Sequence, residues 1–421
     1  MIKKHTLKNG LRIMTEKLDY VKSVSFGIWL KVGSVNEIDD TNGMSHFIEH
    51  MLFKGTENRT ANQIAEETDN IGGQLNAFTS KDCTCFYIKV LDENLNEAVD
   101  ILSDMFFNSK FEQKEIDKEI SVVIEEIKMY EDSPEDVVHD KISEIIFKDS
   151  PLSNPILGTA KNLKTYTKER VLEYKSKQYT PEQTVISVAG SFDEEKLIKM
   201  LEEKFCSWEN NNIEDIKLDC PYTRQIIGVN KDLEQLHICL ANKTIGRHDD
   251  LYYPLIVMNN IIGGTMSSKL FQEIREKRGL VYSIYSFTSN YSETGLFGIY
   301  AGLAYDKLEE TVKTILDIME KMKNSGILLT EFNRAKQQIK SDYILALEST
   351  SSRMSSVGRR QLLYDTISTP DEIVNKINSV KIEDIIKVCN MIFDKKNISV
   401  VYTGNLKKNR NLQSIFENLL N

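Results

Sequence analysis

The chain contains 421 residues, too many for one ordinary hydrophobic core, so its length predicts at least two domains. Hydrophobic residues make up 41% and charged residues 28%, and no apolar run is long enough to cross a membrane, which indicates a globular chain. The net charge of −10 weighs against nucleic acid as a partner, because phosphate binding needs a basic surface. The N-terminal residues resemble neither a signal peptide nor a transit presequence, so we expect a cytoplasmic protein.

Strands and helices alternate along the first half of the chain. Asn9-Gly10 between apolar residues predicts a hairpin. Thr60 is a candidate cap for a helix that stops at Gly72-Gly73. The six cysteines form no CxxC pair, and Cys83 and Cys85 are expected to be packed free thiols, with a metal-binding pair as the alternative. In chain order we expect a hairpin at 6–13, a strand at 24–32, helices at 44–53 and 61–70, a strand or hairpin at 74–90, helices at 95–106 and 112–131, and a buried strand at 184–189.

The polar segment 209–222 predicts a domain boundary that divides the chain almost in half. Each half is expected to be an α+β domain, a sheet covered by helices. The second half repeats the first weakly, with a strand at 236–240, a helix at 251–262 and then Gly263-Gly264. This register places Leu255, Met258 and Asn259 opposite the metal-binding motif described next, so we infer an internal duplication in which only the first half kept the chemistry.

The segment His46-Phe47-Ile48-Glu49-His50 carries the clearest chemical signal. Histidines four residues apart share one face of a helix, so both imidazoles can bind one ion, and Glu49 lies beside the same face. This is the reversed order of the His-Glu-x-x-His zinc motif. We therefore predict a zinc metallopeptidase with His46 and His50 as ligands and Glu49 as general base. The alternative is that the two histidines lie on the surface of an amphipathic helix and have no function. The residues around them are strongly apolar, which predicts a buried helix and disfavours that alternative.

A catalytic zinc site needs a third protein ligand. The acidic helix at 112–131 offers candidates, and Glu119 and Glu126 are seven residues apart, so they share one face. One of them can bind the metal while the other orients a histidine. Spacing alone does not choose between Glu125 and Glu126 as the ligand.

These motifs, together with Arg275-Glu276-Lys277-Arg278-Gly279-Leu280-Val281-Tyr282, resemble the pitrilysin family of inverzincin peptidases. The chain length resembles the shorter branch, which includes the catalytic subunit of the mitochondrial processing peptidase and its bacterial relatives. The resemblance implies Glu126 as the third zinc ligand and Glu119 as the accessory glutamate. It also implies a substrate-binding edge strand at Asn76, Ala77 and Phe78, with Asn76 in the active site. Arg275 and Tyr282 are implied to clamp the substrate and to stabilise charge on the reacting carbonyl.

The resemblance further implies two related domains per chain, half of a four-domain clamshell. Residues 1–210 would form the catalytic zinc-binding domain, and residues 223–421 a related non-catalytic domain that supplies the arginine and the tyrosine. We therefore expect one zinc per chain, a peptide substrate, endopeptidase cleavage inside a closed chamber, and a dimer in which Arg275 and Tyr282 reach the zinc of the partner. A homodimer is favoured, and a heterodimer with a homologue is the alternative. The rival interpretations are a non-catalytic or partner-dependent subunit and a purely structural zinc site.

Overall fold

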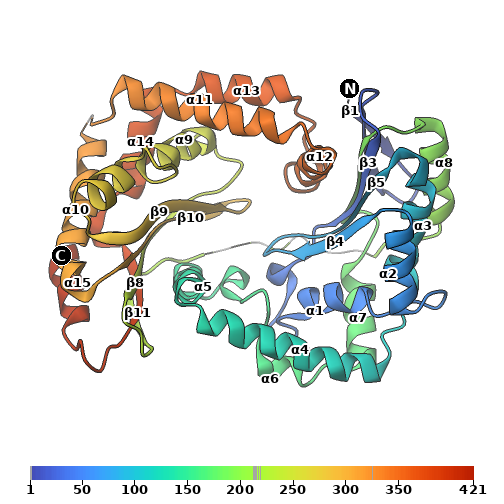
Figure 1. Ribbon diagram of the computed structural model, residues 1–421, viewed down its shortest axis with the longest axis horizontal. Coiled ribbons are helices and arrows are strands. Elements are labelled where there is room, and N and C mark those ends of the chain that lie inside the picture. The colour runs from blue at the N-terminus through green and yellow to red at the C-terminus, as the bar shows by residue number, and fades with distance from the viewer. Residues whose placement is uncertain (1, 212–215, 217, 219, 325) are drawn as a thin grey trace. The chain divides into compact units, whose positions relative to one another are not determined.

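The computed structural model describes residues 2–211, 216, 218, 220–324 and 326–421. The chain forms two compact units, and each unit is assembled from three separate stretches of sequence (Figure 1). Residues 212–215, 217 and 219 of the predicted boundary at 209–222 lie outside the described residues, and the domain ranges 1–210 and 223–421 stay a prediction. Unit 1 contains Met1–Lys128, Asn154–Lys217 and Ile344–Thr369, and unit 2 contains Met129–Ser153, Leu218–Tyr343 and Pro370–Asn421.

Unit 1 is built on a six-stranded sheet with the order β1-β2-β6-β3-β5-β4. Within this sheet β2 and β6 run parallel, and the other neighbouring strands are antiparallel. Strand β4 forms one edge, so one side of its backbone is not paired within the sheet. The strands are β1 (Ile2–Thr6), β2 (Arg12–Lys17), β3 (Ser23–Leu30), β4 (Gln74–Thr79), β5 (Thr84–Leu91) and β6 (Thr184–Gly190).

The main core of unit 1 lies between one face of this sheet and its helices. Alternate residues of a strand point to opposite faces. Phe26 and Ile28 of β3 accordingly enter the main core, whereas Trp29 joins a smaller apolar cluster on the other face. The helices in this part of the chain are α1 (Met44–Leu52), α2 (Ala61–Asn70), α3 (Leu95–Asn108), α4 (Gln113–Asp132), α6 (Ala160–Leu163), α7 (Lys168–Gln178) and α8 (Glu194–Phe205).

Unit 2 is built on a five-stranded sheet with the order β7-β11-β8-β10-β9. Its strands are β7 (Ile226–Asn230), β8 (Leu236–Ile245), β9 (Val281–Asn290), β10 (Thr294–Leu303) and β11 (Ser399–Gly404). Its helices are α5 (Pro134–Ile146), α9 (Tyr252–Ile262), the π-helical turn η4 (Phe271–Glu276), α10 (Leu308–Lys323), α11 (Leu329–Ala346), α13 (Pro370–Ser379), α14 (Ile382–Ile392) and α15 (Leu412–Leu420).

The two sheets repeat one topology. Strands β7 to β11 occupy the places of β2 to β6 in order, including the parallel pair and the antiparallel edge strand. Helix α1 follows β3, and α9 follows β8 in the same way. Leu255 and Met258, expected opposite the metal motif, are fully buried in the core of unit 2. The prediction of an α+β fold with two related domains, each a sheet covered by helices, is confirmed, and its place in a four-domain clamshell stays a prediction.

The second face of each sheet is covered by a helix from a distant part of the sequence. In unit 1, α12 (Thr350–Tyr364) packs on β3 and β6, and in unit 2, α5 packs on β8 and β11 (Figure 1). Trp29 Nε1 donates a hydrogen bond to Met354 Sδ at 3.3 Å. A Cβ atom at Gly358 would lie 2.4 Å from Trp29 Nε1, so only glycine at this position lets α12 pack this closely against β3. In unit 2, His139 of α5 stacks against Tyr285 of β9.

Several local predictions are confirmed. The hairpin around Asn9-Gly10 joins β1 to β2, and the second predicted helix has the bounds of α2. Thr60 caps that helix, because its side chain accepts a hydrogen bond from the Gln63 amide. The cysteines are free thiols, and Cys83 and Cys85 are buried. Within the described part of the chain, no helix has the length and apolar character that crossing a bilayer requires.

Candidate metal centre

Helix α1 presents the predicted motif from an almost fully buried position. Seven of its nine residues are buried, including His46, and the apolar ones pack into the core of unit 1. His46 and His50 are one turn apart, and their ring centroids are 4.6 Å apart. The packing of the apolar residues therefore leaves the two imidazoles side by side on one face of the helix.

Glu126 of α4 completes a cluster of three metal-binding side chains. Its Oε2 lies 3.9 Å from His46 Nε2 and 3.6 Å from His50 Nε2. The three ligand atoms lie within 4.8 Å of one another. Around a tetrahedral zinc ion, nitrogen and oxygen ligands at about 2.0–2.1 Å are about 3.3 Å apart. The spacings between the two imidazoles and the carboxylate are somewhat wider than this, and the donor set fits a catalytic zinc site, which has three protein ligands.

The neighbouring Glu125 turns away from this cluster. Its side chain is exposed and forms an ion pair with Lys128 at 2.7 Å. Adjacent residues of a helix point in different directions, so α4 brings one of the two glutamates to the histidines and exposes the other. Of the two glutamates that the spacing left open, Glu126 is the one that lies beside the histidines, and its role as a metal ligand stays a prediction.

Glu119 holds His50 from behind. It is buried, and its Oε1 lies 2.8 Å from His50 Nδ1 while its Oε2 receives Lys54 Nζ at 2.6 Å. Burial raises the pKa of Glu119, but the hydrogen bonds from His50 and Lys54 outweigh it and hold the pKa below its ordinary value. The carboxylate therefore stays ionised and leaves His50 Nε2 facing Glu126. A carboxylate behind a ligating histidine is a recurrent feature of zinc sites.

His46 has a different environment. Burial, followed by the nearby His50, lowers its pKa to about 4. The ring is therefore neutral at physiological pH, the form that binds a metal. Its Nδ1 atom is buried and makes no hydrogen bond with the described residues. Among the residues that the structure describes, no side chain hydrogen-bonds His46 Nδ1 as Glu119 bonds His50 Nδ1.

The predicted base, Glu49, lies next to the cluster and is held by the edge strand. Thr79, the last residue of β4, donates a hydrogen bond from Oγ1 to Glu49 Oε2 at 2.5 Å. Burial raises the pKa of Glu49, as does Glu126, while Thr79 and His50 lower it, and the net shift is upward. A carboxylate with a raised pKa is better suited to accept a proton near neutral pH.

The expected substrate strand is β4. Its exposed residues alternate, so Asn76 and Phe78 face outward while Ala77 and Thr79 turn toward the helices. The Ala77 amide donates to its neighbour's side chain, Asn76 Oδ1, at 2.8 Å. Phe78 contacts Trp29 edge-on, with ring centroids 5.5 Å apart.

Arg275 and Tyr282 belong to unit 2. Arg275 lies in η4, and its guanidinium stacks over the ring of Phe271 at 4.8 Å. Tyr282 is the second residue of the edge strand β9, and its side chain is 65% exposed. Their predicted role at the metal site stays a prediction.

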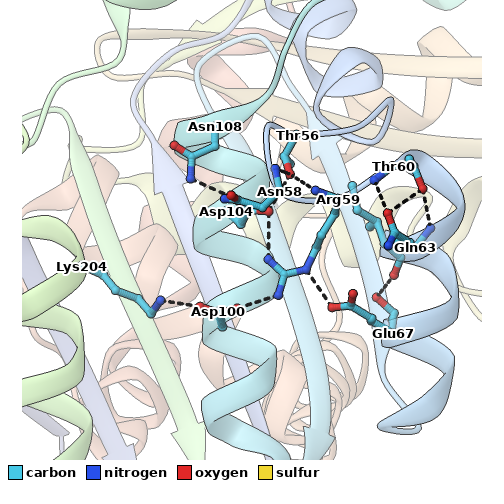
Figure 2. Close-up of polar contacts among 12 residues, drawn as sticks. Thr56, Asn58, Arg59, Thr60, Gln63, Glu67, Asp100, Asp104, Asn108 and Lys204 are labelled. Atoms are coloured by element: carbon cyan, nitrogen blue, oxygen red, sulfur yellow. Dashed lines mark hydrogen bonds and ion pairs between the residues drawn. The ribbon is translucent and has the colours of Figure 1, made fainter.

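The turn that leaves α1 is tied to α3 by charged groups, as Figure 2 shows. Arg59 donates to Asp104 at 2.9 Å, to Asp100 at 2.6 Å and to Glu67 at 2.7 Å. Asp104 is buried, so its charge depends on these donors. Asp104 receives further hydrogen bonds from Thr56, Asn58 and Asn108.

Three residues near the centre were not found from the sequence: Thr79, Lys54 and Glu37. Lys54 follows His50 by four residues, so helical spacing could have placed it on the same face. No sequence pattern marks Thr79 or Glu37. Thr79 reaches Glu49 because β4 packs beside α1, and Glu37 accepts the Gly43 and Ser45 amides because the turn before α1 folds back on the helix.

Comparison with known proteins gives the family. Residues 12–160 match the family described as insulinase (peptidase family M16), and residues 165–339 match the peptidase M16 inactive domain. A Bacillus subtilis protein named as an uncharacterized zinc protease, YmxG, is 43% identical over 93% of this chain and 96% of its own length. The chain belongs to peptidase family M16.

Other relatives extend this assignment. A Rickettsia felis protein, also named as an uncharacterized zinc protease, is 39% identical over 95% of this M16 chain and 97% of its own length. The crystal structure of a protease from Helicobacter pylori superimposes with a TM-score of 0.87 at 23% identity, and covers 96% of this chain and 99% of that chain. The last comparison shows a shared fold. The relatives' names agree with a zinc metallopeptidase.

Proposed function

We propose that this M16 protein is a zinc-dependent endopeptidase that cleaves peptides or unfolded segments inside a closed chamber. The observation that carries the proposal is the convergence of His46, His50 and Glu126, with Glu49 beside them. The names of the relatives support the peptidase class. A structural zinc site would instead have four closed protein ligands, usually with cysteine.

The side chains divide the chemistry among them. His46, His50 and Glu126 would hold one zinc ion, which supplies a Lewis acid that lowers the pKa of water and polarises the scissile carbonyl. Glu49 takes the proton from the attacking water and transfers it to the leaving amine. Thr79 holds Glu49 in place for this transfer, and Glu119 keeps the ring of His50 directed at the metal.

An extended peptide would add to the open edge of β4. Strand addition lets the backbone supply affinity while side-chain pockets supply selectivity. The Ala77 amide, now bonded to the Asn76 side chain, is available to a substrate carbonyl once Asn76 turns aside. The exposed Phe78 would contact substrate side chains.

Arg275 and Tyr282 would clamp the substrate and stabilise the charge that develops on the reacting carbonyl. By its resemblance to the clamshell peptidases, the chain would work as a dimer in which these residues reach the zinc of the partner. A homodimer is the proposed assembly, and a heterodimer with a homologue is the alternative. A fully active monomer in solution would contradict this part of the proposal.

Zinc binding by two neighbouring variants tests the site. We expect wild-type protein to bind one zinc per chain and Glu126→Gln to bind at least about tenfold more weakly, because a charged ligand is lost. Glu125→Gln is the matched control, since the same change at the adjacent exposed residue leaves the cluster intact. Equal zinc affinity in the two variants would remove Glu126 from the metal site. A wild-type protein that binds zinc but never cleaves peptides would favour the non-catalytic subunit.

A further inference from the structure

The N-terminus of α1, the helix that carries His46 and His50, is capped by a carboxylate from the turn before it. The N-cap residue of α1 is Gly43, whose φ of 99° lies in the left-handed region and which has no side chain to cap the helix. Glu37 fills this role from six residues upstream. Its Oε2 accepts the Gly43 amide and its Oε1 accepts the Ser45 amide, each at 2.7 Å. One carboxylate therefore binds two of the free N–H groups that begin the helix.

Glu37 is nearly inaccessible to water, with 3% of its surface exposed. Burial raises its pKa and hydrogen bonds from Gly43, Ser45 and Asn42 partly offset this, so that the net pKa is about 7. Asn42 Nδ2 donates to Glu37 Oε2 at 3.1 Å. The positive end of the helix dipole also favours a negative charge at this position. Burying a carboxylate raises the free energy of the folded state unless hydrogen-bond donors stay in place around it. Glu37 therefore favours the one conformation of residues 42–45 in which all its donors reach it.

The turn is fixed from its other side as well. A Cβ atom at Gly43 would lie 2.8 Å from Gly158 Cα, so the backbones touch where no side chain fits. Tyr166 Oη donates to the Asn42 carbonyl at 2.8 Å, and Tyr174 Oη lies 2.9 Å from Ser45 Oγ. The first turn of α1 is thereby clamped between Glu37 and the segment around α7.

These contacts fix the part of α1 that carries His46, the proposed ligand whose Nδ1 has no hydrogen bond among the described residues. His46 follows Ser45 directly and lies in the first turn of α1. Its Nδ1 makes no hydrogen bond with the described residues, whereas His50 Nδ1 is held by Glu119. The direction of the His46 ring is therefore set by the position of the helix backbone.

We propose that Glu37 is a positioning residue for the metal site, which fixes the first turn of α1 and through it directs the His46 imidazole at the metal. It does not contact the metal or the substrate. The inference rests on the proposed zinc site, and it concerns how that site is built rather than what it cleaves.

Glu37→Gln tests the proposal, because glutamine keeps the shape but turns an amide N–H₂ toward the helix N–H groups. Glu16→Gln is the matched control. Glu16 is equally buried in unit 1 but pairs with Arg353 on the α12 side of the sheet. Two properties are measured: zinc affinity by competition with a chelator, and amide hydrogen exchange in the metal-free protein for a peptide covering residues 43–52.

We expect Glu37→Gln to weaken zinc affinity at least about tenfold, as for other residues that orient ligands, and to speed exchange across residues 43–52. Glu16→Gln should leave both within about twofold of wild type. Wild-type behaviour of Glu37→Gln, or equal losses in both variants, would overturn the proposal.

Two further outcomes stay informative. If the wild-type protein bound no zinc, the proposed function and the metal-positioning role of Glu37 would both fail, and the exchange comparison in metal-free protein would still show whether Glu37 fixes the first turn of α1. If Glu37→Gln did not fold, Asn42→Ala would replace it, since it removes one donor to Glu37 and leaves the carboxylate. Asn42→Ala should then show a smaller loss of zinc affinity, and unchanged affinity would contradict the inference.

Discussion

Thr79 is the residue that joins the edge strand to the predicted base. Valine at this position keeps the shape of the side chain but cannot donate to Glu49. We expect Thr79→Val to bind zinc like the wild type and to have a kcat about tenfold lower, the effect of one hydrogen bond to a charged group, because Glu49 is less well held. KM should change little, since the substrate backbone is not involved. Steady-state kinetics with a peptide substrate, together with zinc titration, check this.

The control for that substitution is Thr68→Val on α2 rather than Thr84→Val on the neighbouring strand, because the Thr84 hydroxyl lies 3.4 Å from that of Thr79 and its loss would disturb Thr79. Thr68 is buried, and its hydroxyl donates to the Ile64 carbonyl at 2.7 Å. It should lose stability but keep most of its kcat. A Thr79→Val enzyme as fast as the wild type would mean that Glu49 needs no hydrogen bond from β4.

Sequence reasoning went furthest where the ligands lie on one helix. His46, Glu49 and His50 follow from helical periodicity, and the structure places both imidazoles together. The pattern could not separate Glu125 from Glu126, because neighbouring glutamates look alike until α4 packs against α1. Thr79 could not be found, because it reaches Glu49 only when β4, thirty residues further along the chain, packs beside α1. Glu37 could not be found, because capping patterns place the capping side chain at the N-cap itself and not six residues before it.

At the scale of elements, the Arg59 network anchors the turn after α1 to α3 (Figure 2). Asp104 is 5% exposed and accepts hydrogen bonds from Arg59, Thr56, Asn58 and Asn108. We expect Asp104→Ala to lower the free energy of unfolding by about 3 kcal/mol, since it leaves Arg59 and several polar groups without their common acceptor. Urea unfolding measured by circular dichroism checks the size of the effect.

Glu173→Ala is the control for that measurement. Glu173 forms an ion pair with Lys177 on the surface of α7, with both side chains more than half exposed. Exposed pairs add little to stability, so this variant should unfold like the wild type. Equal unfolding midpoints for the two variants would show that the network does not stabilise unit 1.

Most strands and helices of the first half could be predicted because caps, turns and hydrophobic periodicity act locally. Thr60 and its hydrogen bond to Gln63 show this for α2. The placement of α5 and α12 could not be predicted. An amphipathic helix reveals that it has a buried face, but not which sheet it covers, and each of these two helices covers a sheet built mainly from the other half of the chain.

At the scale of the whole chain, one topology occurs twice with different chemistry. Strands β2 to β6 and β7 to β11 have the same order and directions. Within the described residues, the cluster that could hold a metal occurs in unit 1 alone. In unit 2, α9 has Leu255 and Met258 in its core-facing positions, so the second helix serves packing. The weak sequence repeat suggested a duplication, and the strand order shows that the two units share one topology.

Peptide cleavage by the purified protein tests the central claim most directly. A quenched-fluorescent peptide library would be incubated with wild-type protein, with chelated protein, with chelated protein after zinc is returned, and with Glu49→Gln. We predict cleavage that is lost on chelation and restored by zinc. Glu49→Gln should bind zinc normally but cleave at least about a hundredfold more slowly, as expected for loss of a general base. Cleavage that survives chelation, or a Glu49→Gln variant as fast as the wild type, would contradict the account.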